Sequence, residues 1–208
     1  MQAALAPRVS SLGLAEYGDV SARMREFTHR RDADTPDEVW VVEHPPVYTV
    51  GQGADAKVGP RTANGIPVVQ SERGGEITYH GPGQAVVYTL VDLHRRGIKV
   101  KAFVRLLEQC AIEFLGGHGV PAERKAGAPG VYVDGAKIAA LGIRVTRGRA
   151  WHGLSLNVDM DLSPYDAIDP CGYPGLKVVQ LKDFGVRTTA QDAGAMLAGL
   201  LFRSLDHA

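Results

Sequence analysis

Two side chains of this sequence have the chemical type and the setting that covalent catalysis needs, a cysteine in a turn and a lysine among apolar residues. Cys171 lies between Asp169 and Gly175, in a stretch rich in proline and glycine that places it by turn geometry rather than by core packing. Lys137 precedes the apolar residues Ile138 to Leu141, and an ammonium there can perturb a nearby acid. We predict that the two side chains meet and carry acyl transfer.

The pairing matters because a free thiol, with a pKa of about 8.5, is only a few per cent ionised at neutral pH. A lysine ammonium in contact with Cys171 would lower that pKa by roughly one to three units and make the thiolate the main form. Taken alone, Lys137 also fits a solvated charge at the end of a strand. The hypothesis therefore depends on the pair rather than on either residue.

A glycine-rich segment, Arg73 to Gln84, is the second candidate for chemistry. Its glycines permit positive φ and a close approach of the backbone, so the segment can wrap a ligand and point N–H groups at it. It lacks the Lys-Ser/Thr of a phosphate-binding P-loop and the spacing of a dinucleotide fingerprint. A bend in a structural hairpin is the alternative.

Three histidines, His44, His80 and His152, are the third candidate. None has the spacing to a second histidine or cysteine that a zinc site requires. A lone histidine is more often a hydrogen-bonded structural residue than a catalytic one, and only His80 gains weight from its glycine-rich neighbourhood. Cys110 lies on the apolar face of a predicted helix, so we expect it in the core.

The composition is that of an ordinary globular protein of 208 residues, and we expect a single domain over residues 1–208. Lys plus Arg and Asp plus Glu both number 23, and the net charge of zero gives no reason to expect nucleic acid or a membrane as a partner. The sequence shows neither a secretory h-region near its start nor a run of about 18 apolar residues. Two cysteines are too few for a disulfide scaffold. We therefore expect a cytoplasmic protein with free thiols.

Helical and extended patterns alternate along the chain and indicate how these residues are positioned. Apolar residues at helical spacing predict helices from Leu14 to Phe27, from Val100 to a stop at Gly116-Gly117, and after a capping box at Thr189 and Asp192, with Met196, Leu197, Leu200 and Leu201 facing inward. Short apolar runs predict strands at residues 39–42, 67–70, 84–91, 151–158 and 176–181.

The dipeptide Asp134-Gly135 is a strong hairpin signal, because it separates two apolar runs. The hairpin would place Lys137 at the start of a strand beside a tight turn, and residues 151–158 would pair onto it. Many strands joined by short turns, with three helices between and around them, predict a two-layer α+β fold.

The sequence resembles the lipoyl(octanoyl) transferases in several blocks that occur in the family's order between about residues 39 and 181. These blocks are Glu43-His44-Pro45 with Tyr48-Thr49 and Gly51, Arg73-Gly74-Gly75 with Thr78 to Gln84, Lys137 to Gly142, Gly153 to Asn157, and Pro170-Cys171-Gly172. Each block alone is a weak signal, and together they are specific. Ala140 departs from the serine of many members, and Tyr173-Pro174-Gly175 departs from the commoner continuation after the cysteine.

The resemblance implies the catalytic fold of the biotin and lipoate protein ligases, a mostly antiparallel sheet with flanking helices. It implies transfer of an octanoyl group from octanoyl-acyl carrier protein to a lysine of a lipoyl domain, through an acyl thioester on Cys171 and with Lys137 as acid and base. No cofactor, ATP or metal is implied. The acceptors implied are the lipoyl domains of 2-oxoacid dehydrogenase complexes and the glycine cleavage H protein. The residues implied to bind substrate are Arg73, Gly74, Gly75, Glu76, Ile77, Thr78, Tyr79, His80, Ala140, Leu141, Gly142, Gly153, Leu154 and Ser155.

Three other functions fit the same residues. A lipoate–protein ligase shares the fold and a lysine near position 137, but it spends ATP on an acyl adenylate and needs no nucleophilic thiol. A cysteine hydrolase would pair Cys171 with His80 or His152, and a non-catalytic module would only bind the carrier. Arg124-Lys125, or Arg144 with Arg147 and Arg149, would dock an acidic carrier or lipoyl domain, or else form a solvated basic rim.

Overall fold

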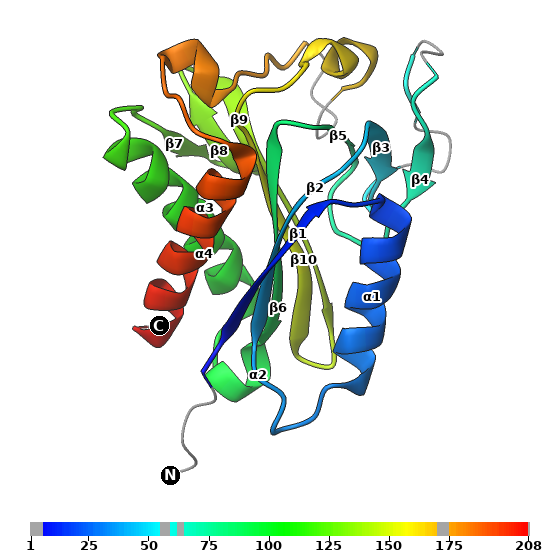
Figure 1. The fold of residues 1–208 in the computed structure, drawn as a ribbon, viewed down its shortest axis with the longest axis vertical. Helices are drawn as coiled ribbons and strands as arrows, with labels where there is room; N and C mark the ends of the chain where they lie inside the picture. Colours follow the sequence, from blue (N-terminus) through cyan, green and yellow to red (C-terminus); the bar gives the residue numbers. More distant parts are fainter. Residues whose placement is uncertain (1–5, 55–58, 62–64, 170–174, 208) are drawn as a thin grey trace.

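The computed structural model describes residues 6–54, 59–61, 65–169 and 175–207, and Figure 1 shows how their helices and strands are arranged. In chain order these are β1 (Arg8–Leu14), α1 (Tyr17–Arg30), β2 (Glu38–Glu43), β3 (Val47–Val50), β4 (Val68–Gln70), β5 (Ile77–His80), β6 (Gln84–Asp92), α2 (Leu93–Arg96), α3 (Val100–Gly117), β7 (Glu123–Lys125), β8 (Ala128–Val133), β9 (Ala136–Thr146), β10 (Arg149–Asn157), the 3₁₀ turns η1 (Ser163–Ala167) and η3 (Leu181–Phe184), and α4 (Ala190–Asp206).

A seven-stranded sheet runs through the middle of the molecule in the order β1-β2-β6-β10-β9-β8-β7. β1 is parallel to β2, and the other neighbouring strands of this sheet are antiparallel. A smaller three-stranded sheet, β4-β3-β5, lies beside it. The predicted α+β class, with a mostly antiparallel sheet and flanking helices, is confirmed.

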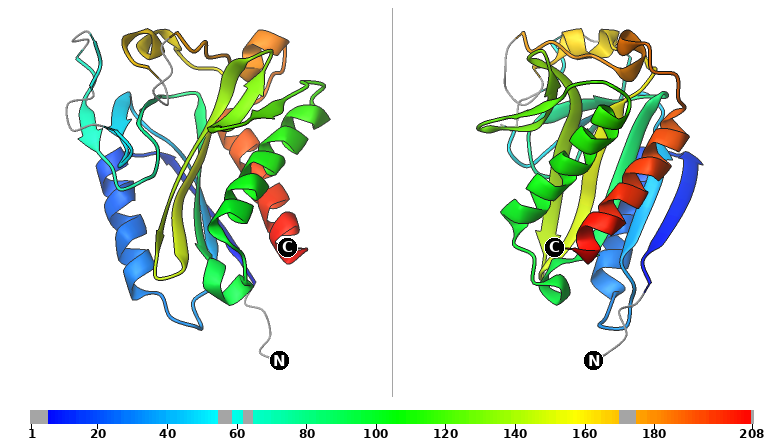
Figure 2. Two further views of the ribbon diagram at one scale, coloured as in Figure 1. Left: turned by 180° about the vertical axis from the view of Figure 1, so that it is seen from behind. Right: turned by 90° about the vertical axis from the view of Figure 1, so that its left-hand side faces the viewer.

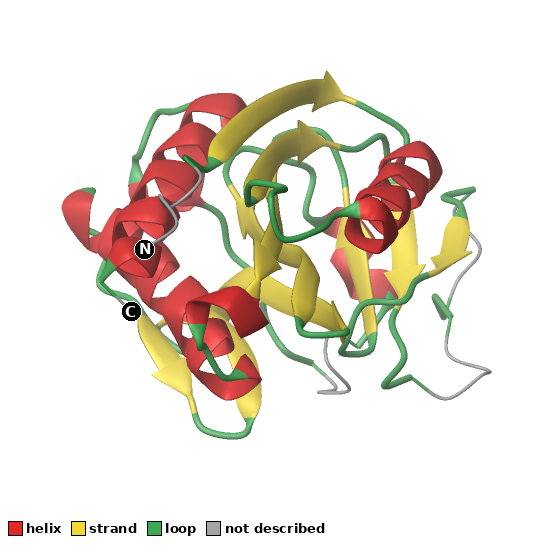
Figure 3. Cartoon of the chain, turned by 90° about the horizontal axis from the view of Figure 1, so that it is seen from below, coloured by secondary structure: helices red, strands yellow, loops and turns green. Residues whose placement is uncertain are grey.

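Helices cover both faces of the large sheet, as Figures 2 and 3 show. α3 and α4 pack on one face around side chains such as Val41, Leu107 and Leu154, which are almost completely buried. Cys110 belongs to this cluster, as predicted. α1 covers part of the other face, where Met24 and Trp151 are buried. Full burial of such side chains stabilises the fold by roughly 1.5–3 kcal/mol each, so the two helical layers hold the sheet rigid.

Local sequence signals explain several boundaries. Asp134 and Gly135 both have positive φ, 48° and 78°, as a type I′ turn requires, and they join β8 to β9. The side chain of Thr189 accepts a hydrogen bond from the backbone N–H of Asp192 and begins α4 as predicted. β10 pairs with β9 over Arg149 to Leu156, so the strand expected to add to the hairpin does so.

Three local predictions are wrong. Leu14 ends a strand and is 62% exposed, because α1 begins only at Tyr17. Residues 176–181 make one isolated bridge, between Val178 and Lys137, instead of a full strand. Met196 is 50% exposed on α4. Across the described residues, none of the helices combines the length and the apolar character needed to cross a membrane.

Candidate active site

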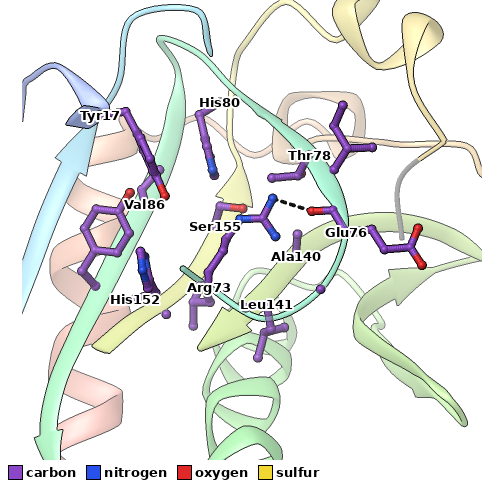
Figure 4. Close-up of a pocket in the computed structure, with 16 residues that line it drawn as sticks. Tyr17, Arg73, Glu76, Thr78, His80, Val86, Ala140, Leu141, His152 and Ser155 are labelled. Carbon is purple, nitrogen blue, oxygen red and sulfur yellow. Dashed lines mark hydrogen bonds between the residues drawn. The ribbon is translucent and has the colours of Figure 1, made fainter. Parts of the chain in front are cut away.

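One cavity is lined by side chains that come from distant parts of the sequence and meet on the large sheet (Figure 4). It holds about 480 Å³ of empty space, its opening included. Its walls are Tyr17 of α1, Arg73, Gly75 to Thr78 and His80, Val86 and Tyr88 of β6, Ala140 to Gly142 of β9, and His152 to Ser155 of β10.

Twelve of the fourteen residues predicted to bind substrate line this cavity: Arg73, Gly75, Glu76, Ile77, Thr78, His80, Ala140, Leu141, Gly142, Gly153, Leu154 and Ser155. Gly74 lines an adjoining hollow instead. Tyr79 is also outside the cavity, since its ring packs against Tyr48 and Tyr165 in a separate apolar cluster. Successive residues of a strand face opposite sides, which explains why Tyr79 turns away while its neighbours do not.

Hydrogen bonds hold the loop before β5 against β9, and glycines allow the two backbones to approach closely. Arg73 donates from Nε and Nη2 to Oγ1 of Thr49, at 3.0 and 2.9 Å, and from Nη2 to the carbonyl of Glu76, at 2.7 Å. The N–H of Gly74 donates to the carbonyl of Ile143 at 3.0 Å. A Cβ at Gly142 would lie 2.7 Å from the carbonyl oxygen of Gly74, so glycine is needed for this close approach.

His80 is fixed on both sides of its ring. Nδ1 donates to the side-chain oxygen of Gln84 at 2.6 Å, and Oγ1 of Thr49 lies 3.4 Å from Nε2. Gln84 is itself bonded to Asn157 and Tyr165. Burial, together with the charges of neighbouring groups, lowers the pKa of His80 to about 3. The imidazole is therefore neutral at physiological pH, with its one N–H donated to Gln84.

The other two histidines are also neutral. His44 donates from Nδ1 to the carbonyl of Ala15 at 2.6 Å and accepts at Nε2 from the hydroxyl of Tyr88 at 2.7 Å. Burial lowers the pKa of His44 to about 4. Burial also lowers the pKa of His152 to about 3, with a smaller contribution from the charges of Arg73 and Arg25.

Lys137 is buried at the start of β9, and its side chain is 3% exposed overall. Nζ donates to the carbonyl of Pro129 at 3.0 Å and lies 5.6 Å from the centre of the Tyr132 ring. A Cβ at Gly130 would lie 2.6 Å from Cε of Lys137, so the glycine leaves the room that the side chain occupies. This environment replaces the solvated strand end that Lys137 alone also suggested.

Cys171 lies outside the described residues, so its distance from Lys137 is not part of the structure. The structure does describe the chain that follows Cys171, from Gly175 onward. The backbone N–H of Lys137 donates to the carbonyl of Lys177 at 2.8 Å, and the N–H of Val179 donates to the carbonyl of Lys137 at 3.0 Å. Asn157 adds a hydrogen bond from Nδ2 to the carbonyl of Val179 at 3.0 Å. Three hydrogen bonds therefore tie the segment after the cysteine to β9 and β10.

A second hollow adjoins the cavity and includes a residue that binds Lys137. It is lined in part by Pro129, whose carbonyl accepts from Lys137, and it shares Gly75, Glu76, Leu141 and Gly142 with the cavity wall. The surroundings of the lysine and the cavity on β9 and β10 are thus neighbouring parts of one surface.

Tyr17, Val86, Tyr88 and His152 line the cavity but were not predicted to. Tyr17 is buried on α1, within the helix predicted from Leu14 to Phe27, but helical spacing does not indicate which cavity the ring reaches. All nine residues of β6 are buried, so the strand has no alternation that would have selected Val86 and Tyr88.

Known proteins resemble this chain closely. A family model described as the lipoyl protein ligase A/B catalytic domain matches residues 17–199. An octanoyltransferase of Aromatoleum aromaticum is 57% identical over 197 residues, which are 95% of this chain and 85% of the relative. An octanoyltransferase of Dechloromonas aromatica is 54% identical over 200 residues, 96% of this chain and 97% of the relative.

Solved structures share the fold at low sequence identity. A lipoate-protein ligase A bound with ATP has a TM-score of 0.75 and 13% identity, and the match covers 98% of this chain and 85% of the ligase. The biotin protein ligase of Aquifex aeolicus has a TM-score of 0.57 and 9% identity, with coverage of 97% and 70%. These two likenesses concern the fold alone.

Proposed function

The chain belongs to the octanoyltransferases, within the lipoyl protein ligase A/B catalytic domain family, and we propose that Cys171 and Lys137 carry its acyl transfer. As a member of this family it is an acyltransferase that moves an octanoyl group in protein lipoylation. The donor we propose is octanoyl-acyl carrier protein. The acceptors we propose are lysines on the lipoyl domains of 2-oxoacid dehydrogenase complexes and on the glycine cleavage H protein.

The observation that carries this proposal is the main-chain pairing of Lys137 with Lys177 and Val179. Lys177 follows Cys171 by six residues, so the pairing anchors the chain after the cysteine beside the buried lysine. On the other side of the cysteine, Asp169 forms an ion pair with Arg61. Both ends of the short segment are therefore held close to the fold, as a nucleophile that must meet Lys137 requires.

In the first step the thiolate of Cys171 attacks the carbonyl carbon of the donor thioester. The bond between that carbon and the carrier sulfur breaks, and the ammonium of Lys137 gives its proton to the departing thiolate. The products are an acyl thioester on Cys171, the free carrier thiol and a neutral Lys137. A thioester is exchanged for a thioester, so the step needs no external energy source.

In the second step the amine of the acceptor lysine attacks the acyl-enzyme. Neutral Lys137 takes the proton that the amine loses, an amide forms, and the Cys171 thiolate is released. Thioester to amide is downhill, and both groups return to their starting protonation states.

β9 is better placed than β10 to offer backbone donors to the developing oxyanion. Gly153 to Ser155 lie on β10, which pairs with β6 on one side and β9 on the other. Their backbone N–H groups therefore donate to neighbouring strands of the sheet. β9 pairs with β8 only as far as Ala139, and the loop at Gly74 reaches the free side of the strand beyond it. We therefore assign the donor role to the Ala140 to Gly142 segment and a shaping role to Gly153 to Ser155.

The histidines argue against a cysteine hydrolase. A general base at neutral pH needs a pKa near that pH, and burial brings the pKa of both His80 and His152 to about 3. Both ring nitrogens of His80 also have neighbours within the fold. A ligase mechanism is separated from the proposal by the thiol, because an acyl adenylate forms without one.

Intact mass spectrometry after mixing with octanoyl-carrier protein tests the proposal. We expect a mass increase of one octanoyl group in the wild type and in Cys110→Ala, the matched control at the buried cysteine, and none in Cys171→Ala. Lys137→Met should form the adduct at least a hundredfold more slowly, the usual effect of losing a general acid or base. An unmodified wild type, or transfer that persists in Cys171→Ser in the presence of ATP, would refute the covalent route.

A further inference from the structure

His152 differs from the other histidines at the cavity because its buried ring has no hydrogen-bond partner among the described residues. The residue is 1% exposed, and neither Nδ1 nor Nε2 is bonded within that part of the chain. The ring nitrogens of His44 and His80 all lie near polar partners. Native folds rarely leave a buried polar atom unpaired without a role for it.

The backbone holds this ring in the cavity against the alternation of its strand. Ala150, Leu154 and Leu156 of β10 face the α3 and α4 layer, and the period of two would send His152 to the same side. Its φ of +62° turns it away, so that its ring stacks on Trp151 at 4.5 Å between centroids and meets the edge of Tyr88. A residue other than glycine held in the left-handed region is strained, and such strain is typical of functional sites.

The ring lies at the end of the cavity that is distant from Lys137. His152 pairs with Ile143 across the ladder, six residues along β9 from Lys137, so the two backbones are about 20 Å apart at the rise of a strand. The Lys137 side chain covers part of that length, because its Nζ reaches the carbonyl of Pro129, which lines the second hollow together with Leu141 to Ile143. Figure 4 shows His152 beside Tyr17 and Val86, on the other side of Arg73 from Glu76. An acyl chain that started beside Nζ of Lys137 and ran along the cavity would end toward His152.

A neutral imidazole carries one N–H donor and one nitrogen acceptor. Burial keeps His152 neutral at physiological pH. A hydroxyl group can pair with either ring nitrogen, since it both donates and accepts, and one hydroxyl satisfies one of the two. A terminal methyl group offers neither and would leave both ring nitrogens unpaired.

We propose that His152 is a specificity-determining residue at the far end of the acyl cavity, where it hydrogen-bonds a hydroxyl at the end of an acyl chain. This inference rests on the proposed function, since it takes the cavity to be the acyl slot. A chain that reaches His152 is accepted when it ends in a hydroxyl and disfavoured when it ends in a methyl group. An octanoyl chain fits the apolar stretch of the slot before this polar end.

The test compares two carrier-protein thioesters whose chains have equal numbers of heavy atoms, decanoyl and 9-hydroxynonanoyl. In the wild type we expect kcat/KM to favour the hydroxyl chain by about tenfold, the effect of one satisfied buried hydrogen bond over an unsatisfied one. His152→Gly and His152→Asn both tolerate the left-handed backbone. The glycine variant should lose the preference, the asparagine variant should retain part of it, and the exposed His29→Asn should match the wild type.

Binding of the free acids, decanoate and 9-hydroxynonanoate, measured by titration calorimetry on the same proteins, separates this inference from the proposed function. Octanoyl transfer with no hydroxyl preference in either assay, or the same preference in the wild type and His152→Gly, overturns the role of His152. A preference in calorimetry that His152→Gly abolishes supports it, even if octanoyl transfer itself were not found.

Discussion

At the scale of single residues, the cavity combines one buried guanidinium with two neutral imidazoles, and a third neutral imidazole, His44, lies against Tyr88 of its wall. Arg73 is 8% exposed, and its bonds to Thr49 and Glu76 hold the loop over β9. Its positive charge also helps to lower the pKa of His80 and His152, after the larger effect of burial. The histidines are therefore groups of fixed charge state at physiological pH, and the mechanism we propose leaves proton transfer to Lys137.

The histidines should make stability depend on pH. Their pKa values in the fold are about 4 for His44 and about 3 for His80 and His152, below the ordinary value of 6.5. Below pH 6.5 the unfolded chain therefore binds more protons than the folded one, and stability falls as the pH falls. We expect the free energy of unfolding to drop by about 2 kcal/mol per histidine between pH 7 and pH 5, measured by urea denaturation.

The variant His152→Asn removes one of these groups, so its stability should fall less steeply over the same range. His29→Asn, at an exposed position, should leave the slope unchanged. Equal slopes for the wild type and His152→Asn would show that His152 titrates normally in the fold.

At the scale of elements, the site depends on how closely three segments approach one another. β10 lies between β6 and β9, and Gly153 brings its backbone against that of β6. A Cβ at Gly153 would lie 2.0 Å from the carbonyl oxygen of Val87, a distance that no rotamer can relieve. The glycine in the block Gly153 to Ser155 is therefore needed for packing as well as for the shape of the slot.

Gly153→Ala should lower the free energy of unfolding by about 1–3 kcal/mol or more, as overpacking at a rigid site does. Gly199→Ala is the matched control, because an added Cβ would meet no described residue within 4 Å outside its own stretch of helix, and alanine favours the interior of α4. It should raise stability by about 0.5–1 kcal/mol. The free energy of unfolding of both variants is measured by urea denaturation. A Gly153→Ala protein as stable as the wild type would contradict the close contact between Gly153 and the carbonyl of Val87.

At the scale of the whole molecule, charge near the cavity bears on the proposed docking of a carrier protein. Arg144 is exposed on β9 next to Ile143, which lines the second hollow, and it contacts Gln52. Arg149 is partly buried and lies 3.6 Å from Asp92, so it has a structural role. Of these two predicted docking residues, Arg144 is thus the better candidate, and Arg147 of the same prediction is also exposed.

Arg144→Glu should raise the KM for octanoyl-carrier protein several-fold at low salt, and the difference should shrink as salt screens the charges. Arg203→Glu makes the same change of charge at an exposed position near the end of α4 and should leave KM unaltered. If the two variants behave alike in steady-state kinetics, the rim at Arg144 is solvated surface and not a docking site.

The sequence by itself determined the features that depend on neighbours along the chain. The turn at Asp134-Gly135 and the cap at Thr189 follow from local backbone chemistry, and the α+β class follows from the hydrophobic pattern. The blocks from Arg73 to Ser155 indicated the octanoyltransferase family, and the relatives bear that out.

Tertiary structure alone decided how those blocks meet. Nothing local predicts that Tyr17 of the first helix closes a cavity between β6, β9 and β10. Alternation along β10 alone would place His152 on the face covered by α3 and α4. Its positive φ turns the ring to the cavity instead, and that backbone conformation depends on the surrounding sheet and cavity. The apolar run at residues 176–181 predicts a strand, yet in the structure this segment pairs with β9 through one isolated bridge, between Val178 and Lys137. The physical reason is that packing between segments distant in sequence selects among local conformations of similar energy.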